Sequence, residues 1–133
     1  MLVLDTDVVS NLMRRRPSPN LKSQLAEAHA AGQTLHTTTI TLGELCYGAY
    51  KANRIELFEL AIQILSSVQI LDFDQPSAQH YGRLRADFER QGIRLADPDL
   101  RIASTVLTHT ATLVTGNIRH FERIPELSLS NWL

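Results

Sequence analysis

The chain alternates short apolar runs with longer segments in which apolar residues recur at helical spacing. The short runs are typical of buried β-strands, and the longer segments are typical of helices with one buried face. We expect strands at Leu2–Leu4, Leu35–Ile40, Gln69–Phe73, Thr112–Thr115 and Leu127–Leu129. We expect helices at Asp7–Arg14, Leu21–Ala31, Leu42–Ala52, Ile55–Ser67, Pro76–Gln91 and Pro98–His109.

This alternation predicts the fold class. No hairpin turn joins consecutive strands, and parallel strands need helical crossovers of the kind the pattern shows. We therefore predict an α/β fold of three layers, α/β/α, around a central, mostly parallel sheet of four to five strands. No linker, repeat or low-complexity stretch divides the 133 residues, so we expect residues 1–133 to form a single domain.

Composition narrows the classes of function. Hydrophobic residues make up 44% of the chain and charged residues 20%, which is typical of a soluble globular protein. Cys46 is the single cysteine, which excludes an internal disulfide and a thiolate metal cage. No apolar run approaches the roughly 20 residues of a membrane span, so we expect no membrane association and a cytoplasmic location. The net charge of −1 gives no sign of nucleic-acid binding.

Acidic residues gather where the predicted strands end. Asp5 and Asp7 follow the first strand, Glu44 comes shortly after the second, and Asp97 and Asp99 open the helix before the fourth. The carboxyl ends of parallel strands lie at one edge of a sheet, which is where ligands bind in such folds. We therefore expect these carboxylates to converge, together with the Thr115–Asn117 segment that leaves the fourth strand.

Each acid also has an explanation within its own helix. Asp5 is in position to cap the first helix, and the Thr41-x-x-Glu44 spacing matches a capping box. Asp97 before a proline resembles an N-cap, and Asp99 favours the helix dipole. Converging carboxylates, however, repel one another unless a cation or protons neutralise them. Oxygen ligands suit Mg²⁺ or Mn²⁺, whereas the five scattered histidines offer no zinc spacing and are expected in surface or packing roles.

Four segments resemble, in order, the motifs of PIN domains. These segments are Leu2–Asp7, Ile40–Gly48, Asp99–Ala103 and Leu113–Asn117 followed by Phe121. More narrowly, the chain is similar to VapC toxins of bacterial toxin–antitoxin pairs in Tyr81–Ala86 and Leu127–Trp132. The resemblance covers nearly the whole chain.

The resemblance implies a PIN-like domain with endoribonuclease activity. It implies a Mg²⁺- or Mn²⁺-dependent toxin that hydrolyses phosphodiester bonds of a structured RNA such as tRNA or rRNA, leaving a 5′-phosphate and a 3′-hydroxyl. Asp5, Glu44 and Asp99 match the family's catalytic, metal-binding acids. Either Glu44 or Asp7 would accept the proton of the attacking water.

Two positions depart from the family pattern. Asp7 stands where the family often has asparagine, and Asn117 stands where some PIN domains have another aspartate. The amide adds no negative charge, which favours one weakly held metal before substrate binds. We therefore expect supporting roles for Asp7, Thr115 and Asn117, and a capping role for Asp97.

Partners follow from the same resemblance. VapC toxins generally form homodimers and are inhibited by a VapB antitoxin, so we expect a VapB-like antitoxin and a homodimer. Candidate interfaces are the apolar Ile55–Ser67 helix and Leu12–Met13, for which burial within the monomer is the alternative. Phosphate contacts are expected from arginines for which an ordinary solvated surface is the alternative: Arg14, Arg15, Arg16, Arg83 and Arg85.

Two other functions compete with this prediction. The segment Asp5–Asp7 also resembles the nucleophile motif of haloacid-dehalogenase-like phosphatases, but neither Lys22 nor Lys51 is placed for that chemistry, and Glu44 has no role in it. A catalytically silent PIN-like binding module is the second alternative. The presence of all three predicted catalytic acids argues against it.

Overall fold

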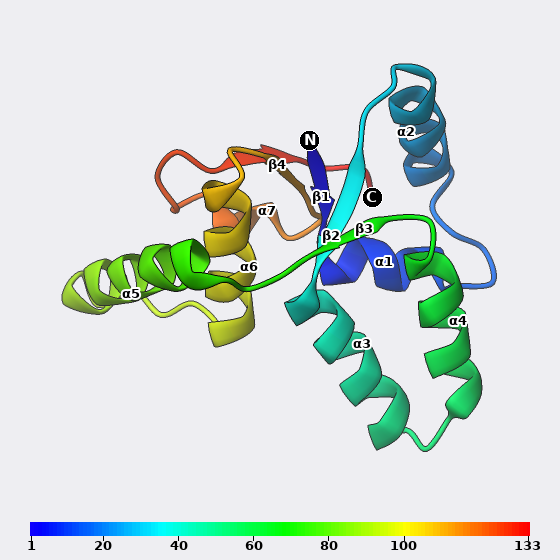
Figure 1. The fold of residues 1–133 in the computed structure, drawn as a ribbon, viewed down its shortest axis with the longest axis horizontal. Helices are drawn as coiled ribbons and strands as arrows, with labels where there is room; N and C mark the ends of the chain where they lie inside the picture. Colours follow the sequence, from blue (N-terminus) through cyan, green and yellow to red (C-terminus); the bar gives the residue numbers. More distant parts are fainter.

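The computed structural model describes residues 1–133, and its five strands form one parallel sheet (Figure 1). The strands are β1 (Leu2–Leu4), β2 (Leu35–Thr38), β3 (Gln69–Leu71), β4 (Thr112–Val114) and β5 (Ser128–Ser130). Their order is β3-β2-β1-β4-β5, and every neighbouring pair is parallel. In this register Val3 lies beside His36 on one side and Leu113 on the other. The predicted parallel sheet is confirmed.

Seven helices connect the strands. They are α1 (Thr6–Leu12), α2 (Pro19–Ala30), α3 (Thr39–Lys51), α4 (Ile55–Leu65), α5 (Gln75–Arg90), α6 (Asp97–Thr108) and α7 (Ile118–Phe121). The six predicted helices are present, and their ends differ from the prediction by at most three residues. The short α7 was missed, because four residues are too few to show a helical period.

The strand predicted at Leu35–Ile40 ends earlier than expected. β2 stops at Thr38, whose hydroxyl accepts a hydrogen bond from the backbone N–H of Thr41 at 3.1 Å and so caps α3. Ile40 is therefore in the helix. This shift moves Glu44 from the first turn of the helix to the second.

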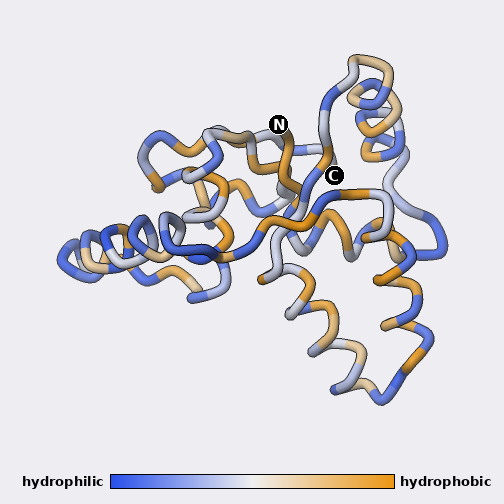
Figure 2. The backbone as a smooth tube through the Cα atoms, in the orientation of Figure 1, coloured by the Kyte–Doolittle hydropathy of each residue, from blue (hydrophilic) through white to orange (hydrophobic).

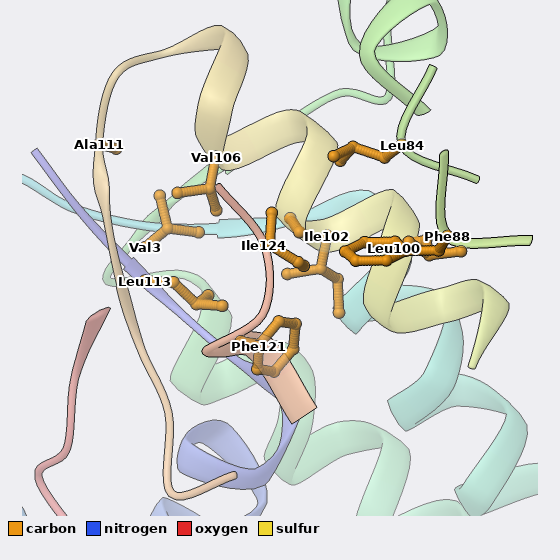
Figure 3. Packing of buried hydrophobic residues seen from close by; sticks show 11 residues of the cluster. Val3, Leu84, Phe88, Leu100, Ile102, Val106, Ala111, Leu113, Phe121 and Ile124 are labelled. Atoms are coloured by element: carbon orange, nitrogen blue, oxygen red, sulfur yellow. The ribbon is translucent and has the colours of Figure 1, made fainter. Parts of the chain in front are cut away.

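Two hydrophobic cores lie on opposite faces of the sheet, because successive strand residues point to opposite sides. Val3 and Leu113 belong to the core that α5, α6 and α7 cover, which Figure 3 shows around Phe121 and Ile102. Leu4, the residue after Val3, belongs with Val114 to the core under α1, α2, α3 and α4. The three-layer α/β/α architecture follows from this division and is confirmed.

The strand order positions the functional edge of the sheet. The central strand β1 lies between β2 and β4, and their carboxyl ends point to the same edge. The chain therefore leaves the sheet at 5–7, 39–44 and 115–117 in one region. Such a point, where successive connections diverge from a central strand, is the usual ligand site of open α/β sheets.

The helices α3 and α4 carry apolar side chains that the monomer leaves exposed. Only Ala61 and Leu65 of α4 are buried, whereas Ile55 and Ile62 expose 60% and 43% of their surface. Figure 2 shows the corresponding hydrophobic stretches along α4. None of the helices combines the length and the apolar character that crossing a bilayer requires.

Candidate active site

Asp5 is the buried centre of the acidic region. It caps α1, with its Oδ1 accepting the N–H of Thr6 at 2.8 Å, while its Oδ2 accepts the Thr115 hydroxyl at 2.7 Å. The residue is 3% exposed. Burial raises the pKa of Asp5 to about 7; the Thr115 and Thr6 hydrogen bonds oppose this rise, and the charges of Asp7 and Asp99 add to it. The carboxyl therefore holds a proton near neutral pH unless a cation compensates its charge.

Asp7 connects the ends of β1 and β4. Its Oδ2 accepts the backbone N–H of Gly116 at 2.8 Å, and its Oδ1 lies 3.5 Å from the Thr115 hydroxyl. A Cβ added to Gly116 would lie 2.8 Å from both Asp7 Oδ2 and Leu133 Cδ1, so a side chain here would displace the Asp7 carboxylate from its present contact. Sequence reasoning placed Asp7 and the Thr115–Asn117 segment near the site, but the hydrogen bond from Gly116 to Asp7 is visible only in the tertiary structure.

Glu44 is not a helix cap. The predicted Thr41-x-x-Glu44 capping box is wrong, because Thr38 is the N-cap of α3. Glu44 Oε1 instead accepts the hydroxyl of Thr6 at 2.7 Å, and Thr6 also lies 3.1 Å from the Thr41 hydroxyl. A contact across 38 residues therefore holds Glu44 toward the start of α1, so the local explanation for this acid no longer applies.

Asp99 lies in the first turn of α6, where it contacts a histidine. His120 Nδ1, from α7, is 3.3 Å from Asp99 Oδ2. Burial raises the pKa of Asp99, and His120 partly opposes that rise. His120 was expected in a surface or packing role, and its place at the site depends on the short α7 that the sequence pattern did not reveal.

Asp97 has a structural role, but not the predicted one. The N-cap of α6 is Ala96, so the predicted cap at Asp97 is wrong. Asp97 accepts the Tyr81 hydroxyl and the Arg101 Nε, the latter at 2.6 Å, with Arg85 Nη1 at 3.7 Å. The residue therefore ties α6 to α5 rather than joining Asp99, because two positions along a helix turn its side chain to another face.

Asn117 and the candidate arginines lie around the site. Asn117 is exposed, and its backbone N–H donates to Thr115 Oγ1 at 3.0 Å while its amide makes no hydrogen bond. Arg14 lines a hollow of about 380 Å³ that Glu44 also lines.

The other candidate arginines are exposed. Arg15 and Arg16 follow α1 and make no ion pair, and the polar contact of Arg83 is with His80 Nδ1 at 3.4 Å. Arg85 is engaged by Glu89 at 3.0 Å and by Tyr81 at 2.8 Å. Only Arg14 therefore borders the acidic residues.

The acidic region lacks a compensating cation of its own. No lysine or arginine pairs with Asp5, Asp7, Glu44 or Asp99, and His120 is the single basic partner. Asp5, Asp7 and Asp99 influence one another electrostatically. The structure gathers no three acidic or histidine side chains tightly around one point. A Mg²⁺ or Mn²⁺ ion at this edge would therefore be held by only one or two of these carboxylates at a time, with water completing its shell, which is how Mg²⁺ commonly binds.

Comparison with known proteins identifies the family. The PIN domain family model matches residues 2–127. Ribonuclease VapC2 of Rickettsia felis is 36% identical over 131 residues, which are 98% of this chain and 96% of the relative. The chain belongs to the VapC group of the PIN-domain family. The tRNA(fMet)-specific endonuclease VapC of Salmonella typhimurium is 35% identical over 71% of the chain and 73% of its own length.

A solved structure shares the whole fold of this PIN domain. The crystal structure of VapBC2 from Rickettsia felis, bound to a DNA fragment from their promoter, matches with a TM-score of 0.89 and 34% identity, covering 99% of this chain and 98% of that one. Family membership disfavours the phosphatase alternative, and so does Lys51, whose ammonium group lies over the Tyr47 ring of α3.

Proposed function

We propose that this PIN domain is a Mg²⁺- or Mn²⁺-dependent endoribonuclease, the toxin of a VapBC-type toxin–antitoxin pair. The observation that carries the proposal is the set of partly or fully buried carboxylates, Asp5, Glu44 and Asp99, at one edge of the sheet without an arginine or lysine to neutralise them. The charges of Asp7 and Asp99 add to the burial that raises the pKa of Asp5, as expected where carboxylates converge without a cation. The ribonuclease names of its relatives agree with this reading.

Asp5 and Asp99 are proposed to hold the ion, with Glu44 as a further ligand directly or through water. When bound, the metal supplies a Lewis acid that activates water and neutralises charge on the scissile phosphate. The protein's part is to fix these carboxylates. The Thr115 hydroxyl orients Asp5, and His120 orients Asp99.

Glu44 is the better placed of the two proposed general bases. One of its oxygens, Oε1, accepts the Thr6 hydroxyl, Oε2 has no protein hydrogen bond, and the residue as a whole is partly exposed. Asp7, by contrast, is anchored to the backbone of Gly116. We therefore assign Glu44 as the general base that accepts the proton of the attacking water. Asp7 holds in place the segment that follows β4.

The proposed substrate is a structured RNA such as tRNA or rRNA. The name of the Salmonella relative, a tRNA(fMet)-specific endonuclease, supports tRNA as the first substrate to test. Proteins recognise such RNAs by the shape of loops and by unstacked bases rather than by reading base edges in a helical groove. Sequencing of the cleaved 5′ ends after induction in cells identifies the target.

The proposed partners are a VapB-like antitoxin and a second copy of the chain. The Rickettsia neighbour is a VapBC assembly, and this chain exposes Tyr47, Tyr50, Ile55 and Ile62 on α3 and α4. Exposed apolar groups of this kind mark protein interfaces. An arginine of the antitoxin set against the free carboxylates would block the site by a charge-assisted pairing.

The replacement Asp99→Asn tests the catalytic assignment. Size and helix position barely change, whereas one anionic ligand is lost, so we expect cleavage of tRNA in Mg²⁺ or Mn²⁺ to be abolished. Asp72→Asn is the matched control, because Asp72 is exposed and makes no hydrogen bond. We expect this control to retain activity.

Two results would count against the proposal, and they differ in meaning. Parental activity in Asp99→Asn would show that this acid is not a ligand. A parental protein that binds a VapB-like antitoxin but cleaves no RNA with either metal would instead identify the silent binding module. A rise in melting temperature on adding the metal to the parent, absent in Asp5→Asn, reports ion binding independently of cleavage.

A further inference from the structure

The helices α5 and α6 lie side by side (Figure 1). A second concave region is lined by residues of both helices and of the loop between them. It has a volume of about 800 Å³. Its lining combines apolar side chains, called the floor below, with three arginines and two acids, called the rim. The floor includes Phe88, Ile93 and Leu95, and none of these residues belongs to the acidic site.

The three arginines of the rim differ in how they are engaged. Arg101 pairs with Asp97 through Nε, and its Nη1 and Nη2 groups make no ion pair. Its guanidinium is held in place, because it lies 5.2 Å from the Phe73 ring centre and 4.8 Å from that of Tyr81. A guanidinium held in this way can donate its remaining N–H groups to the oxygens of a phosphate or carboxylate.

Arg94 supplies uncompensated charge. It is exposed and makes no ion pair or side-chain hydrogen bond. The third arginine, Arg85, is paired with Glu89 and near Asp97. With three guanidinium groups and two carboxylates, the rim carries a net positive charge, in contrast to the acidic site.

The pocket and the acidic site share one turn of helix. Asp97 and Arg101 line the pocket, and Asp99 of the same α6 turn faces the acidic site. A helix with its side chains is about 10–12 Å across. A nucleic-acid strand of a few nucleotides therefore reaches from one face of α6 to the other.

We propose that this pocket binds one nucleotide of a single-stranded RNA segment, a few nucleotides from the scissile bond, with its phosphate on Arg94 and Arg101 and its base on the apolar floor. This inference rests on the proposed ribonuclease function and adds a subsite to it. A basic rim over an apolar floor is the combination by which proteins hold single strands. The carboxylates of an acidic peptide would pair with the arginines of the rim, but they would leave the apolar floor uncovered, whereas a nucleotide base would cover it.

The replacement Arg94→Ala tests the subsite. Binding of a fluorescein-labelled single-stranded RNA is measured by anisotropy in EDTA, which prevents cleavage, at several salt concentrations. We expect the dissociation constant to rise about fivefold and the salt slope to fall by about 0.7, the value for one phosphate contact on a single strand. Arg90→Ala is the matched control: it removes the same charge from an exposed arginine of α5 outside the pocket, so parental binding is expected.

Reversing or restoring the charge at position 94 tests whether this charge is what binds the RNA. Arg94→Glu should weaken RNA binding further than Arg94→Ala, and Arg94→Lys should restore part of it. Equal affinities for the Arg94 and Arg90 variants would overturn the subsite and would leave the pocket to an acidic segment of a protein partner. Cleavage by the parental protein in Mg²⁺ is measured on the same preparations. Its absence would refute the ribonuclease proposal, whereas the EDTA binding data would still decide the subsite.

Discussion

Replacing Asp5 by asparagine should stabilise the metal-free protein above neutral pH. Asp5 is 3% exposed, and burial raises its pKa to about 7 from the ordinary 3.8. The folded protein therefore pays a desolvation cost for the ionised carboxylate that the unfolded chain avoids. Asparagine keeps an oxygen for the Thr6 N–H and offers its amide to the Thr115 hydroxyl, so the two existing contacts have replacements.

The sign and size follow from linkage between protonation and folding. Below about pH 4 the carboxyl is protonated in both the folded and the unfolded chain and has no effect. Between 3.8 and about 7 the unfolded chain loses the proton first, so the free energy of unfolding falls as the pH rises. Above pH 7 the full cost is present. At about 1.4 kcal/mol per pKa unit it amounts to about 4 kcal/mol as an upper bound.

The assay is urea unfolding in EDTA at several values between about pH 5 and pH 8, for the parent, Asp5→Asn and the exposed-site control Asp72→Asn. We expect the Asp5→Asn curve to be flatter with pH and to lie about 2–4 kcal/mol above the parent at pH 8. For a chain of this size that gain corresponds to roughly 3–5 °C of melting temperature per kcal/mol. Asp72→Asn should follow the parent.

A parent and an Asp5→Asn variant with parallel stability curves over this range would refute the reasoning. Such a result would mean that the buried carboxylate is already compensated in the metal-free protein. A variant less stable than the parent at pH 8 would show instead that the hydrogen bonds to the charged form outweigh its desolvation. In either case, uncompensated carboxylate charge would no longer support the proposal that this site binds a cation.

Three further replacements test other parts of the structure. Gly116→Ala places a Cβ 2.8 Å from Asp7 Oδ2, so we expect a loss of about 1–3 kcal/mol in urea unfolding, together with impaired RNA cleavage. Thr6→Val removes the 2.7 Å hydrogen bond to Glu44 and should lower kcat about tenfold, with the fold intact by circular dichroism; unchanged kcat would show that Glu44 needs no such support. Glu126→Gly relieves a left-handed backbone with φ of +66° and should raise the free energy of unfolding by about 1 kcal/mol, a gain that thermal melting checks and that a lower melting temperature would contradict.

Most of the fold was predictable, because its signals are local. The Leu2–Leu4 strand and the helical period of α5 and α6 depend on which side chains must leave water, and sequence spacing records this directly. Parallel pairing followed from the helices between strands. The end of β2 was misplaced because Thr38 and Thr41 are both plausible caps, and only the hydrogen bond that Thr38 makes decides between them.

The sequence by itself determined the α/β class, the position of Asp5 and Asp99 at strand and helix ends, and the resemblance to PIN domains. The tertiary structure decided what each acid contacts. It removed Glu44 from its apparent capping box by giving it Thr6, turned Asp97 toward Tyr81 and Arg101, and brought His120 to Asp99. The physical reason is that spacing along the chain encodes burial and local caps, whereas hydrogen bonds and charge interactions between distant residues exist only once the sheet has brought its strand ends together.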